Sequence, residues 1–262
     1  MIDNKQNISD PDWGQLSVDS EINLSKAYGG IPEKHDHYIH ITNSFVPWNG
    51  DFNRAVNVSP DSVDDLDVII REVRDIHRNK KLDPPNRYDL GPEIKIDNAW
   101  ESNFIAKNMK FSEAVFMQAQ SQEAPSDSDN YLYAPGADEY FSWYRTKMEG
   151  RNYFTEEYYK MLKPLQSSFI TVFKPYWFKV ADEIVGSVYI ADFSEYARLF
   201  EVEIEENRQG RGLGLKMMKA VRHKVKLLGL KYVLLETSGG LPRFYEKCGF
   251  KECIRSKILW QK

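Results

Sequence analysis

The strongest constraint on this chain is a run of three alternating glycines, Gly210, Gly212 and Gly214, in a sequence that holds only 15 glycines. Residues 198–205 before the run are predicted to form a strand, and residues 213–228 after it carry apolar side chains at helical spacing. Free backbone N–H groups at the start of such a helix suit an anion, and glycine lets a pyrophosphate approach the backbone. The segment therefore predicts an α/β fold with a phosphate-binding loop.

Three interpretations of this loop compete. A turn that only joins a strand to a helix does not require Gln209 and Arg211 beside the glycines. A dinucleotide-binding fold is supported by Glu236, which ends the next predicted strand where an acid that binds a ribose would lie. That fold is disfavoured because Leu215 stands where a third glycine is needed, and because the chain after Glu236 is too short to complete a doubly wound sheet. The third interpretation depends on a family resemblance.

Residues 209–214 (QGRGLG) fit the Gln/Arg-x-x-Gly-x-Gly signature of the GNAT superfamily of N-acetyltransferases. Residues 244–250 (FYEKCGF) resemble a second segment of that family, and Val202 and Ile204 stand where it places the apolar residues of its fourth strand. The order of strand, phosphate loop, helix, strand, short helix and strand agrees with the family. The resemblance extends over residues 169–262 and implies a mixed α/β sheet with a GNAT-like fold.

The resemblance implies acetyl-CoA as a co-substrate and no metal. Backbone amides of residues 210–215 would hold the pyrophosphate, and the backbone of residues 202–204 would pair with the pantetheine arm. A strand that is splayed from its neighbour leaves backbone groups free for such pairing. Ser238 stands near a position where many family members carry an Asn that contacts the cofactor. The implied cofactor-binding residues are Val202, Glu203, Ile204, Gln209, Gly210, Arg211, Gly212, Leu213, Gly214, Leu215, Ser238 and Tyr245.

Tyr245 falls where the family keeps a tyrosine that protonates the departing thiolate, so its phenol is the expected general acid. The general base has three alternatives. Glu236 matches a position where some family members keep a catalytic glutamate. Glu203 alternates with Glu201 and Glu205 along the preceding strand, so these three side chains are expected to share one face and one of them to act. A reaction without a base is the third alternative.

A length of 262 residues suits two domains, and the two halves share a weak internal repeat. Each half ends in a strand, a short helix and another strand, with Phe111 and Phe250 in similar places. Residues 51–55 (DFNRA) resemble a segment of the degenerate first halves of tandem acetyltransferases, and the first half lacks the glycine signature. We therefore expect two tandem copies, of which the first is a scaffold. The predicted division is a polar N-terminal arm (1–35), a degenerate GNAT-like domain (36–120), a linker (121–130) and a catalytic GNAT domain (131–262).

The other elements are expected from apolar periodicity and from residues that favour helix ends. Ser59 and Pro60 are predicted to begin a helix that ends near Arg78. Aromatic helices at 138–148 and 155–162 are expected to pack in the core or to line an acceptor pocket. The remaining expected strands are 37–48, 93–96, 111–118, 167–174, 176–180, 183–192, 232–236 and 250–260, and the remaining helices are 99–109 and 241–248.

Histidines and cysteines offer a second place to look for chemistry. His35 and His37 share a face of a strand while His40 does not, and no fourth ligand is visible, so an ordinary strand is favoured over a metal site. Cys248 and Cys253 lack CxxC spacing, and buried thiols are expected.

Charge and composition narrow the function classes. The balance of 35 Lys and Arg against 39 Asp and Glu argues against a nucleic-acid partner. The presence of only two cysteines and the lack of a secretory signal favour a cytoplasmic protein, and the lack of a long apolar stretch argues against a membrane partner. The expected oligomeric state is a monomer or a homodimer. The expected function is acetyl transfer from acetyl-CoA to a primary amine of a small molecule or peptide by direct attack. The alternative is an acyl-CoA-binding sensor or regulatory module without catalysis.

Overall fold

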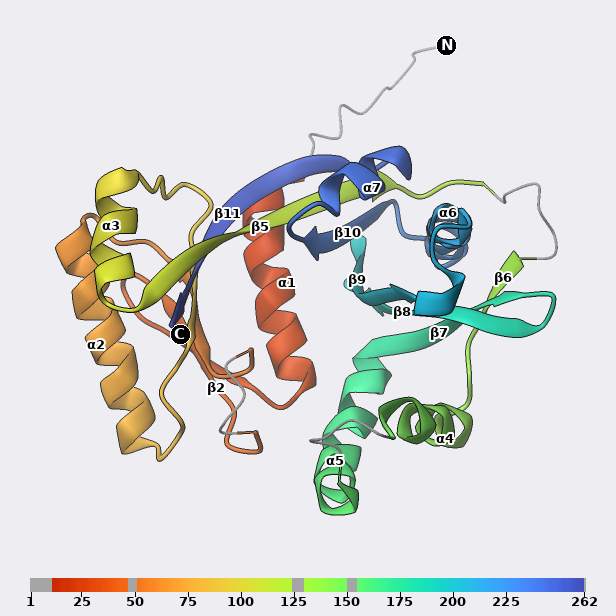
Figure 1. Cartoon of the computed structure of the whole chain (residues 1–262), viewed down its shortest axis with the longest axis horizontal. Coiled ribbons are helices and arrows are strands. Elements are labelled where there is room, and N and C mark those ends of the chain that lie inside the picture. Colours follow the sequence, from red (N-terminus) through yellow and green to blue (C-terminus); the bar gives the residue numbers. More distant parts are fainter. Residues whose placement is uncertain (1–10, 47–50, 124–129, 150–154, 262) are drawn as a thin grey trace, which may run out of the picture.

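The computed structural model describes residues 11–46, 51–123, 130–149 and 155–261. Within them, one mixed sheet has the strand order β1-β2-β3-β4-β11-β5-β10-β9-β8-β7-β6, which confirms the expected mixed α/β sheet (Figure 1). The strands are β1 (Ile31–Lys34), β2 (Ile39–Thr42), β3 (Arg54–Val58), β4 (Arg87–Leu90), β5 (Met109–Gln120), β6 (Asn130–Tyr133), β7 (Phe173–Val180), β8 (Glu183–Asp192), β9 (Tyr196–Ile204), β10 (Tyr232–Thr237) and β11 (Lys251–Gln261). The helices are α1 (Trp13–Ala27), α2 (Val63–Asn79), α3 (Asn98–Ala106), α4 (Ala137–Met148), α5 (Glu156–Val172), α6 (Leu213–Leu227) and α7 (Pro242–Lys247).

The sheet repeats one arrangement in its two halves. In the first half, the parallel strands β3 and β4 are joined through α2, and α3 then leads into the long strand β5. In the second half, the parallel strands β9 and β10 are joined through α6, and α7 leads into the long strand β11. Asn108 and Gly249, both left-handed, follow the ends of α3 and α7. The internal repeat that the sequence indicates is therefore present in the fold.

The two halves exchange their last strands. β5 pairs antiparallel with β10 of the second half, and β11 pairs antiparallel with β4 of the first. β5 and β11 also pair with each other along most of their lengths. The backbone N–H and C=O groups of each half are thus paired in part with a strand of the other half. The division into domains at 36–120 and 131–262 stays a prediction, and most of the expected linker, residues 124–129, lies outside the described residues.

Residues 13–27 form the helix α1, which lies between α2 and α5 in Figure 1. Where the sequence predicts a polar arm, this segment is a helix packed into the core. Leu24 joins an apolar cluster with aromatic residues of α4 and α5, while Ser20 and Glu21 are also buried. Those buried polar residues make the helix resemble a solvated segment in sequence. Residues 31–34 form the edge strand β1, and residues 1–10 lie outside the described part.

The strands β3 and β6 were not expected from the sequence, and three further elements differ from the expected ones. α2 begins after Ser62, whose hydroxyl accepts a backbone N–H of the first turn, rather than after Ser59. Residues 93–96 form a turn and an irregular segment, and the strand is β4 just before them. Residues 167–172 continue α5, where two serine hydroxyls donate to carbonyls of the preceding turn, so a strand does not begin until β7.

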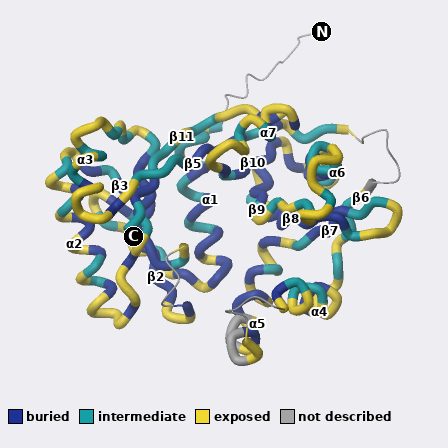
Figure 2. The backbone as a smooth tube through the Cα atoms, viewed as in Figure 1, coloured by how far each residue is buried: buried dark blue, intermediate teal, exposed yellow. Residues whose placement is uncertain are grey.

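One apolar core fixes the helix that follows the glycine loop. Met217, Val221 and Val225 of α6 are buried in one cluster with Val233 and Leu235 of β10. The opposite side of α6 is exposed (Figure 2). This packing holds the N-terminus of α6 against the sheet beside the end of β9. Among the described residues, no helix has the length and apolar character needed to cross a membrane.

Candidate active site

The loop between β9 and α6 needs its glycines for different reasons. Gly210 and Gly212 have φ of 75° and 74°, a left-handed conformation, and a Cβ added at either would meet no heavy atom within 4 Å. At Gly214, an added Cβ would lie 2.9 Å from the ring of Phe244, so glycine there permits the close approach of α6 and α7. The loop is therefore open at its first two glycines and closely packed at the third.

Backbone donors gather at the open part of the loop. Gly212 is the N-cap of α6, the first turn of α6 carries no acidic side chain, and its N–H groups lack partners within the helix. The Gln209 amide donates to the Ile204 carbonyl at 2.9 Å and so fixes the entry to the loop. Arg211 is exposed beside it. A positive helix end with free amides and an adjacent guanidinium suits a pyrophosphate.

β9 separates from β10 part-way along its length. The two strands pair only at Tyr196, Ala197 and Arg198, and beyond that point β9 pairs with β8 alone. Glu201 has φ of 46° and lies at a register shift between β8 and β9, where the strand bends. The backbone of residues 202–204 thus has no strand partner on the β10 side. The splay that the sequence predicts is present.

A cleft of 530 Å³, called the loop cleft here, runs along the glycine loop and the free edge of β9. It is lined by ten of the twelve residues predicted to bind the cofactor. The two others lie elsewhere, since Arg211 is exposed and Ser238 lines a neighbouring cavity. The predicted residues in the loop cleft are Val202, Glu203, Ile204, Gln209, Gly210, Gly212, Leu213, Gly214, Leu215 and Tyr245.

The neighbouring cavity, of 630 Å³, is called the charged cavity here because seven ionisable side chains line it. Val202, Leu241 and Tyr245 line both this cavity and the loop cleft, so the two spaces meet at these residues. Aromatic rings of both halves contribute to its wall, among them Phe52 and Tyr144. The seven ionisable residues other than tyrosine are Glu21, Asp51, Arg54, Arg87, Arg198, Glu201 and Glu236.

Tyr245 lies on α7 with its ring against Phe244 and Phe250. The side chain is largely buried, and this burial raises the pKa of Tyr245 to about 12. The phenol is therefore protonated at neutral pH, as a group that donates a proton must be.

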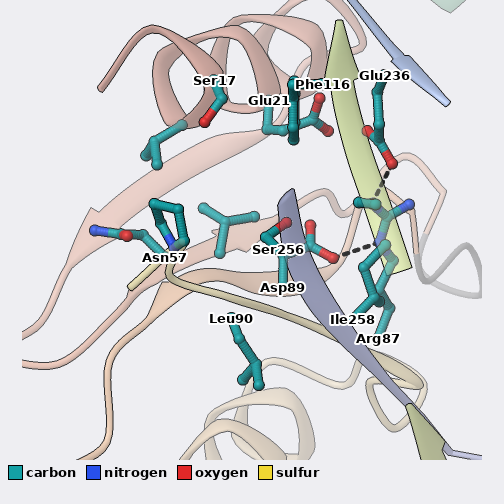
Figure 3. Close-up of a pocket in the computed structure, with 14 residues that line it drawn as sticks. Ser17, Glu21, Asn57, Arg87, Asp89, Leu90, Phe116, Glu236, Ser256 and Ile258 are labelled. Carbon is teal, nitrogen blue, oxygen red and sulfur yellow. Dashed lines mark hydrogen bonds and ion pairs between the residues drawn. The ribbon is translucent and has the colours of Figure 1, made fainter. Parts of the chain in front are cut away.

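Glu236 lies at the end of β10 between two guanidinium groups. One carboxylate oxygen lies 3.7 Å from Arg87 (Figure 3). The other lies 3.5 Å from Arg198. Burial and the negative charge of Glu21 raise the pKa of Glu236 to about 7, although the two arginines oppose the shift. A carboxylate with a pKa near 7 can take up a proton at neutral pH, which suits a general base.

A buried ionic network supports this carboxylate. The Glu21 carboxylate accepts from Arg54 at 2.6 Å and from Arg198 at 2.7 Å. Burial alone would raise the pKa of Glu21, but the charges of Arg198 and Arg54 outweigh it and lower the pKa to about 2. Asp89 in turn accepts from Arg87 at 2.6 Å (Figure 3). Glu21 therefore stays ionised and holds both Arg54 and Arg198 in place.

The network joins the two halves in corresponding positions. Asp89 on β4 lies opposite Ile258 of β11, and Glu236 on β10 lies opposite Phe116 of β5. Both carboxylates face Arg87 (Figure 3). The candidate site is thus built at the junction of the repeats, where each half supplies an acid from the strand before its exchanged strand.

Sequence reasoning missed most of this network. Arg198 had a visible signal, since it is a charged residue in an otherwise apolar stretch of strand, and Arg54 belongs to the DFNRA segment. Glu21, Arg87 and Asp89 had none, because nothing in their local sequence distinguishes them from surface charges.

The expected shared face of Glu201, Glu203 and Glu205 is wrong. The bend at Glu201 breaks the alternation, so Glu201 lines the charged cavity while Glu203 and Glu205 line a different one. Glu203 forms an ion pair with Lys147 of α4 and does not line the cavity that holds Glu236.

The two cysteines are free thiols, and the expected burial is complete for Cys248 and partial for Cys253.

A family model described as an acetyltransferase (GNAT) domain matches residues 174–252. This stretch contains the splayed strand, the glycine loop, Glu236 and Tyr245. The C-terminal half of the chain contains a GNAT acetyltransferase domain. GNAT acetyltransferases use acetyl-CoA, and the open loop and free edge of β9 fit such a molecule. No protein with a curated description matches the sequence.

Solved structures similar to the whole chain extend this result to the fold of both halves. A functionally unknown conserved protein from Staphylococcus epidermidis ATCC 12228 has a TM-score of 0.69 at 14% identity, covering 89% of this chain and 94% of that one. A GCN5-related N-acetyltransferase from Kribbella flavida has a TM-score of 0.66 at 12% identity, covering 97% and 96%. A tandem GNAT protein from the clavulanic acid biosynthesis pathway has a TM-score of 0.51 at 10% identity, covering 94% and 92%. The predicted GNAT-like fold with two tandem copies is confirmed.

Proposed function

We propose that the protein transfers an acetyl group from acetyl-CoA to a primary amine of a small molecule or peptide. The observation that carries this proposal is the meeting of the loop cleft and the charged cavity at Tyr245, with Glu236 in the cavity. A thioester held along the loop cleft and an amine held in the charged cavity would react at that junction. The loop amides and the free backbone of residues 202–204 bind and orient the co-substrate.

The proposed chemistry is direct attack of the amine on the thioester carbonyl. The amine loses a proton to Glu236, whose pKa of about 7 suits that step. As the C–S bond breaks, the departing thiolate takes a proton from Tyr245, whose pKa is raised to about 12 by burial. The products are an N-acetylated amine and free CoA.

The lining of the charged cavity supports a cationic acceptor. Asp51, Glu201 and Glu236 contribute carboxylates, and Phe52 and Tyr144 contribute aromatic faces that attract cations. The guanidinium groups of Arg54 and Arg198 are already paired with carboxylates, Arg54 with Glu21 and Asp89, and Arg198 with Glu21 and Glu236. An ammonium group would enter the cavity and lose its proton there.

A thiol-release assay with acetyl-CoA and a panel of primary amines tests this proposal. We expect CoA release that depends on one class of amine, and Tyr245→Phe should lower kcat by about 100-fold while the Kd for acetyl-CoA stays within twofold. Tyr232→Phe, a second buried tyrosine on β10 outside both clefts, is the matched control and should keep its activity. Tight acetyl-CoA binding without release for any amine would instead favour the non-catalytic sensor.

A further inference from the structure

A cluster of potential metal ligands lies outside the candidate active site, on the hairpin of β1 and β2. Glu33 of β1 and His40 of β2 are direct cross-strand partners, so their side chains lie on one face of the sheet. The turn between these strands brings His35 to the same place. One ligand atom from each of Glu33, His35 and His40 lies within 4.8 Å of the others.

The hydrogen bonds of a neighbouring histidine determine which nitrogen of His40 is free. His77 Nδ1 on α2 lies 2.6 Å from the Asp83 carbonyl, and since a carbonyl only accepts, this nitrogen donates. In neutral His77 the lone pair is then on Nε2, which lies 3.0 Å from His40 Nε2. His40 Nε2 must donate across that contact, so the lone pair of neutral His40 is on Nδ1.

The lone pair on His40 Nδ1 accepts no hydrogen bond within the described part of the chain. His40 is fully buried, and its Nδ1 has no hydrogen-bond partner there. Both rings are fully buried, and a charged imidazole is unfavourable away from water, so both rings are assigned as neutral. A buried acceptor without a partner is unfavourable, and a ligand that uses its lone pair would remove that cost. A neutral imidazole with its second nitrogen held by another group is the usual form of a metal-bound histidine.

The other two groups complete a ligand set with His40. His35 Nε2 is also buried without a partner, and its ring stacks on Tyr38 with centroids 4.5 Å apart. Glu33 carries the carboxylate, and one of its oxygens accepts from Lys80 at 2.6 Å. This lysine is the C-cap residue of α2, and its contact with Glu33 involves one carboxylate oxygen, so the second oxygen is the proposed metal ligand.

We propose that Glu33, His35 and His40 bind a divalent transition-metal ion such as Zn²⁺. Two imidazoles and a carboxylate suit zinc, and water would take the fourth position of a tetrahedral site. His77 and the Asp83 carbonyl hold His40 in its binding tautomer. The sequence alone favours an ordinary strand and groups His35 with His37, because it cannot show that the hairpin places His40 opposite Glu33. The bound ion would cross-link β1, the following turn and β2.

Zinc competition against a chromogenic chelator tests the site on the untagged full-length protein. We expect one Zn²⁺ per chain, with at least tenfold weaker binding in Glu33→Gln and in His35→Ala, both of which are tolerant positions outside the core. His37→Ala, an exposed histidine of the same turn, is the matched control and should bind as the wild type does. Unchanged affinity in Glu33→Gln and His35→Ala, or no binding by the wild type, overturns the proposal.

Two further measurements separate ligation from non-specific binding. Zn²⁺ should raise the Tm of the wild type and of His37→Ala, but not of Glu33→Gln, because an ion that binds only the folded state stabilises it. In the metal-free protein, the ¹⁵N spectrum of the imidazoles should show His40 protonated at Nε2. A proton on Nδ1 instead would remove the lone pair on which the site depends and contradict the proposal.

Discussion

At the scale of single residues, the proposed chemistry depends on one carboxylate whose surroundings shift its pKa in opposite directions. Burial and Glu21 push the proton affinity of Glu236 up, while Arg87 and Arg198 pull it down, and the outcome is a pKa of about 7. Such a group is ionised in a useful fraction of molecules at neutral pH and is still basic enough to accept a proton. The same residue in water would be too weak a base.

The pH profile of the reaction reports on this group. If Glu236 is the base, kcat/KM should fall as the pH drops below about 7, because the carboxylate becomes protonated. Glu236→Gln should lower kcat by about 100-fold or more and remove this limb of a steady-state pH profile. Glu203→Gln, which lies outside the charged cavity, should retain both the rate and the limb. The opposite pattern in the two variants would assign the base to Glu203.

Another residue-scale prediction concerns the closely packed glycine of the loop. Gly214→Ala places a Cβ 2.9 Å from Phe244, so the contact between α6 and α7 must open. We expect a loss of about 1–2 kcal/mol in the free energy of unfolding and weaker acetyl-CoA binding. Denaturant unfolding and calorimetry measure the two effects. Gly240→Ala, where a Cβ meets nothing within 4 Å, is the control, and an equal loss there would contradict the packing argument.

At the scale of elements, the helix α1 is decisive for the site although it is remote from it in sequence. It carries Glu21 into the junction of the two halves, where this carboxylate binds Arg54 and Arg198. The sequence of this segment predicted only a polar arm, and the helix with its Asp12 cap is seen in the structure. The burial of Glu21 depends on these two guanidinium groups, which lie on strands of different halves and both bind its carboxylate.

Removing the charge of Glu21 should lower the stability of the fold. Glu21→Gln leaves two buried arginines less well compensated, so we expect a loss of about 3 kcal/mol in the free energy of unfolding. The pKa of Glu21 is lowered in the fold, so its stabilisation is present above pH 4.5 and disappears as the pH falls towards 2. The variant should lose this pH dependence in urea titrations at several pH values.

The same variant also has a kinetic signature. Because the charge of Glu21 raises the pKa of Glu236, Glu21→Gln should move the acidic limb of kcat/KM to lower pH. Glu33→Gln, an acidic residue of the distant hairpin, should leave the limb in place. A Glu21→Gln profile identical to that of the wild type would show that the network is structural only.

At the scale of the whole molecule, the exchanged strands make the two halves one folding unit. Leu259 is on the last strand of the chain, yet it is fully buried in the core of the first half with Leu66 and Tyr88. Val225 belongs to the core of the second half. A defect in either core therefore weakens strand pairing in both halves of the sheet.

Denaturant unfolding tests this cooperativity. Leu259→Ala and Val225→Ala should each lower the free energy of unfolding, by about 3 and about 2 kcal/mol, in a single transition seen alike by far-UV circular dichroism and tryptophan fluorescence. Two separated transitions in Leu259→Ala would mean that the halves unfold independently. That result would restore the expected division into two domains.

The sequence by itself determined the parts whose physics is local. The glycines, the helix that follows them and Tyr245 lie within a short continuous stretch, so backbone conformation and dipole direction follow from residue types. The splay of β9 and the tandem repeat also left traces in sequence. Periodicity and turn residues were enough to predict most strands. The same reasoning wrongly predicted one strand over residues 93–96 and another that begins inside α5.

Only the tertiary structure decided which distant groups meet. The exchange of β5 and β11 brings Asp89 and Glu236 to one guanidinium, and α1 adds Glu21 from the other end of the chain. The hairpin of β1 and β2 likewise sets His40 beside Glu33. Strand register decides which of these residues meet. Burial then decides how strongly their charges interact and how far their pKa values shift, because both effects grow when water is excluded.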